Sequence, residues 1–150
     1  MQIFRVLTTR LIKTDLQATT KEDLFDEMVS LFVAEGIVSD REAALDAIYD
    51  REEKMSTGVA PGFALPHGKL EGIAGVKMAL GISRAGIEYD ALDGEPVNIV
   101  LMLFSEPKNP APHIEALAEV GRLLSIPGLQ ERLVQAQDAE EVLRILSAEE

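Results

Sequence analysis

The sequence predicts an α/β domain in which a mixed β-sheet lies between layers of α-helices. Two apolar runs near the middle of the chain, Val76 to Ile82 and Val97 to Phe104, have the length of strands, and the second is nearly continuous. Continuous apolar runs are typical of strands that are covered on both faces. Helical patterns stand before and after these runs, so we expect helices on both sides of one sheet.

Two capping boxes, in which Ser or Thr is followed three residues later by Glu, predict the starts of two helices before the central strands. Thr19-x-x-Glu22 begins a helix that we expect to end at Gly36, and Ser39-x-x-Glu42 begins the next. The buried faces of the two helices are predicted to carry Leu24, Met28, Leu31 and Phe32 and then Leu45 and Ile48. A short strand or extended arm ahead of both helices is suggested by Leu11, Ile12 and Leu16.

The segment from Ser56 to Gly68 is rich in glycine and proline and predicts a loop. The loop leads into a short strand, Phe63 to Leu65, which we expect to end at Pro66-His67. Because proline cannot donate to a sheet ladder, this strand should finish at an edge or a bend. Between the two central strands, a turn and a short extra strand are predicted at Asp93-Gly94 and at Ile87 to Tyr89.

Three helices are predicted after the loop from Pro107 to Pro112. The first runs from about His113 to Leu124 and is broken by Pro127-Gly128. Its buried side is expected to carry Ile114, Leu117, Val120 and Leu124. The other two are a short helix around Leu129 to Ala136 and a last one that begins at Asp138-x-x-Glu141. No repeat or linker interrupts the chain, so residues 1–150 are expected to form one domain.

Composition and charge narrow the classes of function. Hydrophobic residues make up 47% of the 150 residues and charged residues 27%, which is typical of a globular chain. The absence of cysteine excludes disulfides, thiolate metal sites and cysteine nucleophiles. A net charge of −12 without a cluster of Lys and Arg argues against nucleic-acid binding.

The chain has no apolar run that could cross a bilayer. Its longest, Ile99 to Phe104, is far shorter than the roughly 20 residues that a membrane helix needs. Met1 to Arg10 lacks the apolar core and cleavage site of a secretory signal. We therefore expect a cytoplasmic protein without direct membrane insertion.

Two histidines, His67 and His113, are the side chains with the widest chemistry in this sequence. An isolated histidine is most often a buried or capping residue without chemistry. His67, however, lies between Pro66 and Gly68 at the expected end of a strand, and residues that a rigid scaffold holds at such loops are where binding and chemistry concentrate.

Groups that could surround a phosphate or another oxyanion lie shortly upstream of His67 and directly after it. Hydroxyls and unobstructed backbone N–H groups are offered by Ser56, Thr57, Gly58, Gly62 and Gly68. Arg51 adds a fixed positive charge with a planar fork that suits phosphate oxygens. This spacing alone leaves two alternatives open, a metal-dependent hydrolase that uses both histidines and a binding module with two structural histidines. No H-E-x-x-H pattern or other compact ligand spacing occurs, so we expect neither a metal nor a cofactor.

A longer stretch around these residues resembles a known family. Arg51 to Lys69 reads REEKMSTGVAPGFALPHGK and closely resembles the phosphorylation-site signature of enzyme IIA (EIIA) domains of the bacterial phosphoenolpyruvate-dependent phosphotransferase system (PTS), fructose/mannitol class. Similar stretches follow in DGEPV from Asp93, HIEALAEVGRLL from His113 and AEEVLRIL from Ala139, so the resemblance covers nearly the whole chain. Within the class, the HGKL that follows Pro66 most resembles the nitrogen-regulatory branch.

The resemblance implies a fold with a mixed sheet between helices and a function as a phosphotransferase. It implies that His67 accepts a phosphoryl group from HPr or an HPr-like carrier protein, that His113 supports the group, and that Arg51 helps to neutralise its charge. Two next steps stay open. In the nitrogen-regulatory type, which we favour, the phosphorylation state controls binding to target proteins; in the sugar-specific type, the phosphate passes to a IIB domain for sugar uptake. The oligomeric state and the nitrogen of His67 that is phosphorylated do not follow from the sequence.

Overall fold

A five-stranded mixed sheet runs through the middle of the molecule in the computed structural model, which describes residues 3–58 and 60–149. The strands are β1 (Ile12–Lys13), β2 (Phe63–Ala64), β3 (His67–Lys69), β4 (Val76–Ile87) and β5 (Val97–Ser105). The strand order is β1-β4-β5-β2, and β3 also pairs with β5. Strands β4 and β5 are antiparallel, whereas β1 is parallel to β4 and both β2 and β3 are parallel to β5. The mixed sheet that the sequence predicts is confirmed.

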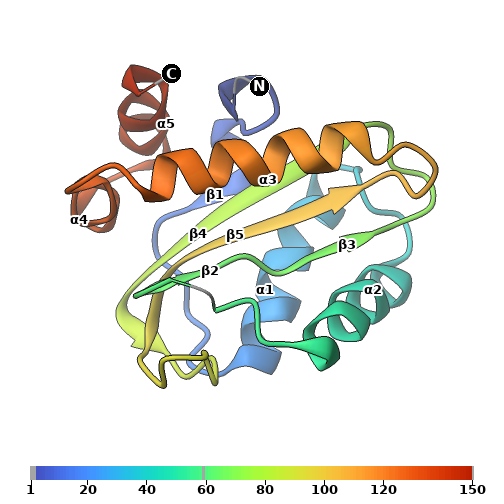
Figure 1. The fold of residues 1–150 in the computed structure, drawn as a ribbon, viewed down its shortest axis with the longest axis horizontal. Helices are drawn as coiled ribbons and strands as arrows, with labels where there is room; N and C mark the ends of the chain where they lie inside the picture. The colour runs from blue at the N-terminus through green and yellow to red at the C-terminus, as the bar shows by residue number, and fades with distance from the viewer. Residues whose placement is uncertain (1–2, 59, 150) are drawn as a thin grey trace.

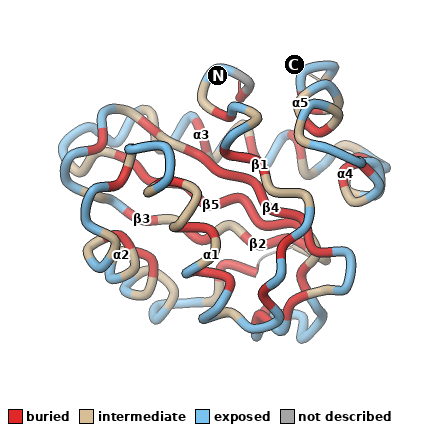
Figure 2. The backbone as a smooth tube through the Cα atoms, turned by 180° about the vertical axis from the view of Figure 1, so that it is seen from behind, coloured by how far each residue is buried: buried red, intermediate tan, exposed pale blue. Residues whose placement is uncertain are grey.

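Helices cover both faces of this sheet. The helices are α1 (Lys21–Ala34), α2 (Arg41–Lys54), α3 (Ala111–Leu124), α4 (Leu129–Gln135) and α5 (Ala139–Ala148), and two short 3₁₀ turns, η1 (Ile3–Arg5) and η2 (Thr9–Leu11), precede β1. Figure 1 shows α3 crossing one face, α1 behind the strands, α2 below β3, and α5 close to the N-terminal segment. The opposite view in Figure 2 shows α1 and α2 in front and the buried residues concentrated along β4 and β5. The expected α/β sandwich is confirmed, and no helix among the described residues is both long and apolar enough to cross a membrane.

Two of the three predicted helix caps are displaced by one residue. Thr20, not Thr19, caps α1, and its hydroxyl accepts a hydrogen bond from the N–H of Asp23 at 3.3 Å. Asp40, not Ser39, caps α2 by accepting from the N–H of Ala43 at 3.1 Å. Both starts carry two adjacent residues that can cap, and the second of each pair has the extended backbone that a cap requires. The third predicted cap, at the start of α5, is confirmed.

The edge of the sheet near His67 also differs from the prediction. The expected strand from Phe63 to Leu65 is two short strands, β2 and β3, which lie end to end along β5. Pro66 stands between them, and its carbonyl accepts from the N–H of Leu103 at 3.1 Å, so pairing with β5 continues across the break. Proline lacks only a donor, and on an edge strand that donor is not needed. His67 therefore begins a strand, and the prediction that a strand ends there is wrong.

Strand β4 is longer than predicted, because it extends beyond Ile82 to Ile87. A register shift between Ile82 and Ile87 lets β4 continue until Ile87 pairs with Val97, so the expected separate strand at Ile87 to Tyr89 is wrong.

The buried side of helix α3 differs by about one residue from the predicted side. Ile114 is 62% exposed, which contradicts its predicted burial. Leu117 and Leu124 are only partly buried, and the buried side is formed by Ala116, Val120 and Leu123. His113 precedes Ala116 by three residues and Val120 by seven, so it lies on the same side of α3 as these buried residues. That side faces the sheet.

Candidate active site

Three elements bring the two histidines together at one edge of the sheet. His67 is the first residue of β3, and His113 lies in the first turn of α3. Their ring centroids are 5.3 Å apart, and the ring planes are inclined by 49°. With α2 they line an open cleft of about 370 Å³, whose other lining residues are Ala47, Asp50, Arg51, Lys54, Gly68 and Lys69. The three residues to which the resemblance assigns chemistry therefore share one cleft.

The ring of His67 is held through its Nδ1 atom. This nitrogen lies 2.8 Å from the carbonyl oxygen of Leu65. A carbonyl can only accept, so in the neutral ring Nδ1 carries the proton and Nε2 has a free lone pair. The pKa of His67 is lowered because burial disfavours the imidazolium, an effect that outweighs the hydrogen bond to Leu65; the charge of Arg51 lowers it further. Near pH 7 this ring is therefore neutral, with Nε2 available as a nucleophile.

The ring of His113 is held by a residue of β5. Its Nδ1 lies 2.7 Å from the hydroxyl oxygen of Ser105, the last residue of that strand. Burial lowers the pKa of His113, and repulsion by His67, when that ring is protonated, and by the ammonium of Lys69 lowers it further. Both rings of the cleft are consequently neutral near pH 7. Ser105 is not among the residues that the sequence singles out, because nothing in the local pattern pairs it with a histidine eight residues away.

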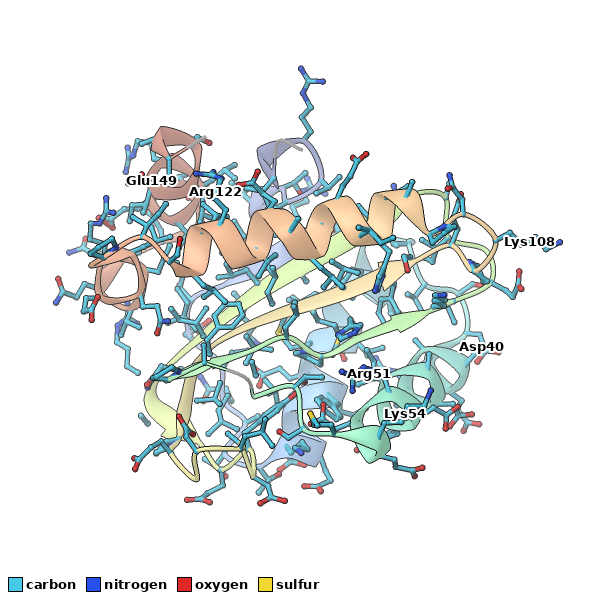
Figure 3. All side chains as sticks on the ribbon, viewed as in Figure 1. Asp40, Arg51, Lys54, Lys108, Arg122 and Glu149 are labelled. Atoms are coloured by element: carbon cyan, nitrogen blue, oxygen red, sulfur yellow. The ribbon has the colours of Figure 1, made fainter. Side chains whose placement is uncertain are left out.

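Three cations line the cleft of a chain whose net charge is −12. Arg51 donates through Nη1 to the carbonyl of Met55 at 3.0 Å, and within residues 3–58 and 60–149 its other N–H groups have no hydrogen-bond partner, so they can serve a ligand. Figure 3 shows Arg51 and Lys54 on the side of α2 that faces β3. Lys54 and Lys69 are exposed and were not predicted as site residues. Their spacing carries the signal, because Lys54 is three residues after Arg51 on a helix and Lys69 is two residues after His67 on a strand.

Gly68 is the one predicted glycine that lines the cleft, within the part of the chain that the structure describes. A Cβ atom there would lie 3.0 Å from the carbonyl oxygen of Ala47 and 3.1 Å from the Cβ of Ala47. Glycine at this position therefore lets α2 approach β3 closely. That approach brings Arg51 and Lys54 to the same cleft as His67.

The family of the chain is decided by comparison with known proteins. The family model described as "Phosphoenolpyruvate-dependent sugar phosphotransferase system, EIIA 2" matches residues 5–149. The chain belongs to this family. Membership carries phosphotransfer as a general activity, and it agrees with a cleft that holds two neutral histidines among cations.

The relatives of this EIIA domain include both sugar-specific and nitrogen-regulatory proteins. A fructose-specific EIIA component from Haloferax volcanii is 30% identical over 145 residues, covering 97% of this chain and 94% of that protein. The fructose-specific EIIABC component of Bacillus subtilis is 33% identical over 98% of this chain, which spans only 23% of that longer protein. A nitrogen regulatory protein from Bradyrhizobium diazoefficiens is 26% identical over 98% of this chain and 95% of its own length.

Solved structures show the same two groups. The nitrogen regulatory protein IIA-Ntr from Neisseria meningitidis superimposes with a TM-score of 0.88 at 29% identity, covering 97% of this chain and 99% of that one. The mannitol IIA of Escherichia coli shares the fold, with a TM-score of 0.77 at 22% identity over 93% of this chain and 97% of that chain.

Four of the predicted phosphate-binding residues of the EIIA domain lie outside the lining of the cleft. The hydroxyl of Ser56 accepts from the N–H of Gly58 at 3.1 Å. Gly58 packs so closely that an added Cβ would lie 2.6 Å from the Cβ of Ala91. Gly62 has φ +72°, a conformation that favours glycine, and its carbonyl accepts from two N–H groups at the start of β5. These residues shape the loop that leads into β2 and β3.

Thr57, the fourth of these residues, belongs to a buried polar network. It is 2% exposed, and its hydroxyl lies 2.6 Å from a carboxylate oxygen of Glu52 and 2.7 Å from the hydroxyl of Tyr89. Glu52 also accepts from the N–H of Thr57 at 2.9 Å and forms an ion pair with Lys21 at 3.1 Å. Burial alone would raise the pKa of Glu52, but the hydrogen bonds from Thr57 and Lys21 outweigh it and lower the pKa. This network was not predicted, although Glu52 and Thr57 both lie in the family signature.

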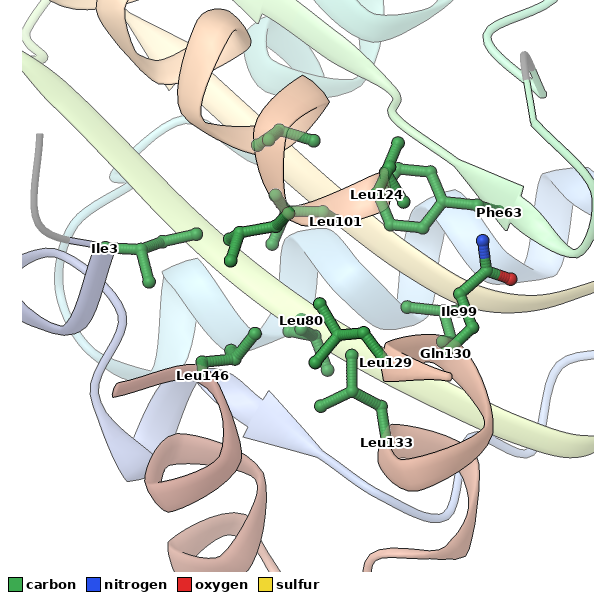
Figure 4. Close-up of a pocket in the computed structure, with 12 residues that line it drawn as sticks. Ile3, Phe63, Leu80, Ile99, Leu101, Leu124, Leu129, Gln130, Leu133 and Leu146 are labelled. Atoms are coloured by element: carbon green, nitrogen blue, oxygen red, sulfur yellow. The ribbon is translucent and has the colours of Figure 1, made fainter. Parts of the chain in front are cut away.

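A second hollow in the EIIA domain is apolar and lies between the sheet and the C-terminal helices (Figure 4). Its volume is about 30 Å³, and apart from Gln130 each of its described lining residues is hydrophobic. It offers no nucleophile or charge. Among residues 3–58 and 60–149, no three His, Cys, Asp or Glu side chains are grouped so that they could hold a metal ion.

Proposed function

We propose that this EIIA domain is a phosphohistidine carrier in which Nε2 of His67 accepts a phosphoryl group from HPr or an HPr-like protein in the cytoplasm. The observation that carries the proposal is the fixed tautomer of His67. Its Nδ1–H is committed to the carbonyl of Leu65 at 2.8 Å, which leaves Nε2 as the nucleophile. That nucleophile stands in a cleft lined by Arg51, Lys54 and Lys69.

The transfer needs one bond formed and one bond broken. The lone pair on Nε2 attacks the phosphorus atom of the incoming phosphohistidine in line, and the P–N bond to the donor ring breaks as the new one forms. The donor ring keeps the electron pair of the broken bond. Phosphoryl transfer asks mainly for positioning and charge stabilisation, which the edge strand β3 and the three cations supply. His113, with its ring centroid 5.3 Å from that of His67, supports the phosphoryl group.

The surroundings of the cleft suit docking of a partner protein. Met55 follows α2 directly after Lys54 and is 57% exposed, and Ile114 follows His113 and is 62% exposed. A single exposed apolar side chain is common on protein surfaces, but both of these stand next in sequence to a cleft residue, where a docking partner would cover them. We assign these two side chains to the surface that the donor and the acceptor cover in turn.

Two downstream roles fit the proposed carrier. The regulatory role, in which the phosphorylation state controls a target protein, is supported by the IIA-Ntr structure with its TM-score of 0.88. The uptake role, in which a IIB domain receives the phosphate, is supported by the fructose-specific relatives at 33% and 30% identity, above the nitrogen regulatory protein at 26%. A neighbour of the same fold, the mannitol enzyme IIA of Escherichia coli, was solved in complex with phosphorylated enzyme IIB.

The carrier function is tested with HPr that is already phosphorylated, in excess chelator. The wild-type domain should take up acid-labile phosphate, the His113→Ala variant should do so more slowly, and the His67→Ala variant should take up none. Labelling of a histidine in the His67→Ala variant would overturn the assignment. To separate the two roles, the labelled domain is mixed with a purified fructose-type IIB domain: rapid loss of label supports uptake, and retention supports regulation.

A further inference from the structure

Ser105 lies beside Nδ1 of His113, and its backbone is paired with a strand on each side. It is the last residue of β5, is completely buried, and pairs in register with Lys69 of β3 and Val76 of β4. Its carbonyl accepts from the N–H of Leu70 at 2.9 Å. The serine backbone therefore cannot move without disturbing two strands, and its hydroxyl reaches His113 Nδ1 at 2.7 Å from a rigid position.

The direction of this hydrogen bond follows from the burial of the hydroxyl. Within residues 3–58 and 60–149, Nδ1 of His113 is the partner of the Ser105 hydroxyl, and no second acceptor is in reach. If Nδ1 carried a proton and donated it, the hydroxyl hydrogen would be buried without an acceptor, which is unfavourable. The hydroxyl therefore donates to Nδ1. In the neutral ring, the proton of His113 is then on Nε2.

We propose that Ser105 is a positioning residue that fixes His113 as its Nε2–H tautomer, so that this ring donates a hydrogen bond to the phosphoryl group on His67. The proposal rests on the carrier function proposed above. It makes the two histidines complementary. The carbonyl of Leu65 selects the tautomer of His67 with a bare Nε2, and Ser105 selects the tautomer of His113 with a protonated Nε2.

The complementarity gives the cleft a donor that carries no full charge. A neutral Nε2–H can bond to a phosphoryl oxygen before, during and after transfer, and it does not repel the cations around it. Loss of the hydroxyl frees the ring to adopt the other tautomer and other orientations. One neutral hydrogen bond is then made for only part of the time, which corresponds to about a 3- to 10-fold slower transfer.

The tautomer is measured directly by two-bond ¹H–¹⁵N correlation spectra of the imidazole rings at pH 7.5, without any phosphoryl donor. In the wild type we expect His113 to show a protonated Nε2 and an unprotonated Nδ1. In the Ser105→Ala variant the two nitrogens should show averaged shifts. A matched control is Ser83→Ala, which removes another buried hydroxyl that bonds to the N–H of Gly86 and contacts neither histidine. A proton on Nδ1 of His113 in the wild type would overturn the proposal.

The role in transfer is measured by a double-mutant cycle with phosphorylated HPr. Ser105→Ala should slow phosphate uptake 3- to 10-fold in the wild type and have no further effect in the His113→Ala variant, while Ser83→Ala leaves the rate unchanged. Equal slowing in both backgrounds would mean that Ser105 does not act through His113. Absence of label in the wild type would overturn the carrier function instead, and labelling of the His67→Ala variant would overturn the assignment of His67, so these failures are distinguishable from that of Ser105.

Discussion

Arg51 and Glu52 are neighbours in sequence, yet they belong to two polar regions with opposite character. Arg51 lines the open histidine cleft, where it uses one N–H on the carbonyl of Met55 and keeps the others for a ligand. The side chain of Glu52 is 6% exposed, and its carboxylate accepts hydrogen bonds from Lys21, Thr57 and Tyr89. The helix periodicity separates the two side chains by about 100°, which is enough to place one in each region.

The difference shows how one signature serves both chemistry and scaffold. The donors and the nucleophile of the cleft can act on a ligand because hydrogen bonds within the protein do not use all of their capacity. The Glu52 network is useful because its groups are consumed: it joins the start of α1, the end of α2, the loop at Thr57 and the chain after β4. We therefore expect changes in the network to act on stability and changes in the cleft to act on transfer.

The largest effect on stability is expected for Glu52→Ala. The change leaves the ammonium of Lys21 and the N–H of Thr57 without their buried partner, and breaking a buried pair from one side costs about 3 to 5 kcal/mol. The free energy of unfolding, measured with urea, should fall by about 3 kcal/mol. The matched control is Glu53→Ala, because Glu53 is exposed and should change the value by less than about 0.5 kcal/mol. A loss of under about 1 kcal/mol for Glu52→Ala would show that the network does not hold these elements together.

The next effect is expected in the cleft. Arg51→Ala removes a preorganised donor from the phosphoryl site and should slow uptake of phosphate by about 100-fold, the usual cost of losing one such group. The free energy of unfolding should change by about 1 kcal/mol or less, because the bond to Met55 is exposed. Arg51→Lys should recover part of the rate, since charge is kept and the planar fork is lost. Transfer at the wild-type rate in Arg51→Ala would remove Arg51 from the site.

Much of the fold follows from the sequence because its strongest patterns are long. The apolar runs of β4 and β5 and the five helical segments are found where the periodicity predicts them. Features that depend on one or two residues, such as a helix cap, are harder to predict, because two adjacent residues can satisfy the same rule. Thr19 and Thr20 can both cap a helix, and a helix with apolar residues on several sides does not reveal by itself whether Ile114 or His113 faces the sheet.

The sequence predicts which residues of the signature belong near the site, but not which of them line the cleft and which are buried in the scaffold. His67, His113 and Arg51 meet in one cleft, whereas Thr57 and Gly58 of the same signature turn inward. Burial of a threonine hydroxyl depends on Tyr89, which is 32 residues away. Ser105 likewise gains its partner only through the fold of β5 and α3. Contacts of this kind are set by packing, and no local spacing records them.

The smallest effect, the pH dependence of stability, should separate the two regions once more. Burial lowers the pKa of His67 and of His113 below the usual 6.5. At a pH between the lowered pKa of the folded protein and the ordinary pKa of the unfolded chain, the unfolded chain binds more protons than the folded one. Stability should therefore fall as the pH drops below about 6.5. Burial would raise the pKa of Glu27, but the ion pair with Lys13 at 2.8 Å and the N–H groups of Gln17 and Ala18 outweigh it and lower the pKa. The lowered pKa values of Glu52 and Glu27 act below 4.5: their contribution is complete above that pH and is lost as the folded carboxylates take up protons.

Urea unfolding from pH 7.5 to about pH 3, which enters the window below the carboxylate value of 4.5, tests this order. A His67→Gln, His113→Gln double variant should lose the upper part of the decline and keep the lower part. Glu52→Gln should lose part of the lower decline, because Glu27 still titrates there, and keep the upper one. The chain has two histidines, so the upper window contains no other side chain of this type. An unchanged decline between pH 7 and pH 5.5 in the double variant would mean that the rings are not held neutral by the fold, and the nucleophile of the cleft would then have to be deprotonated when the donor docks.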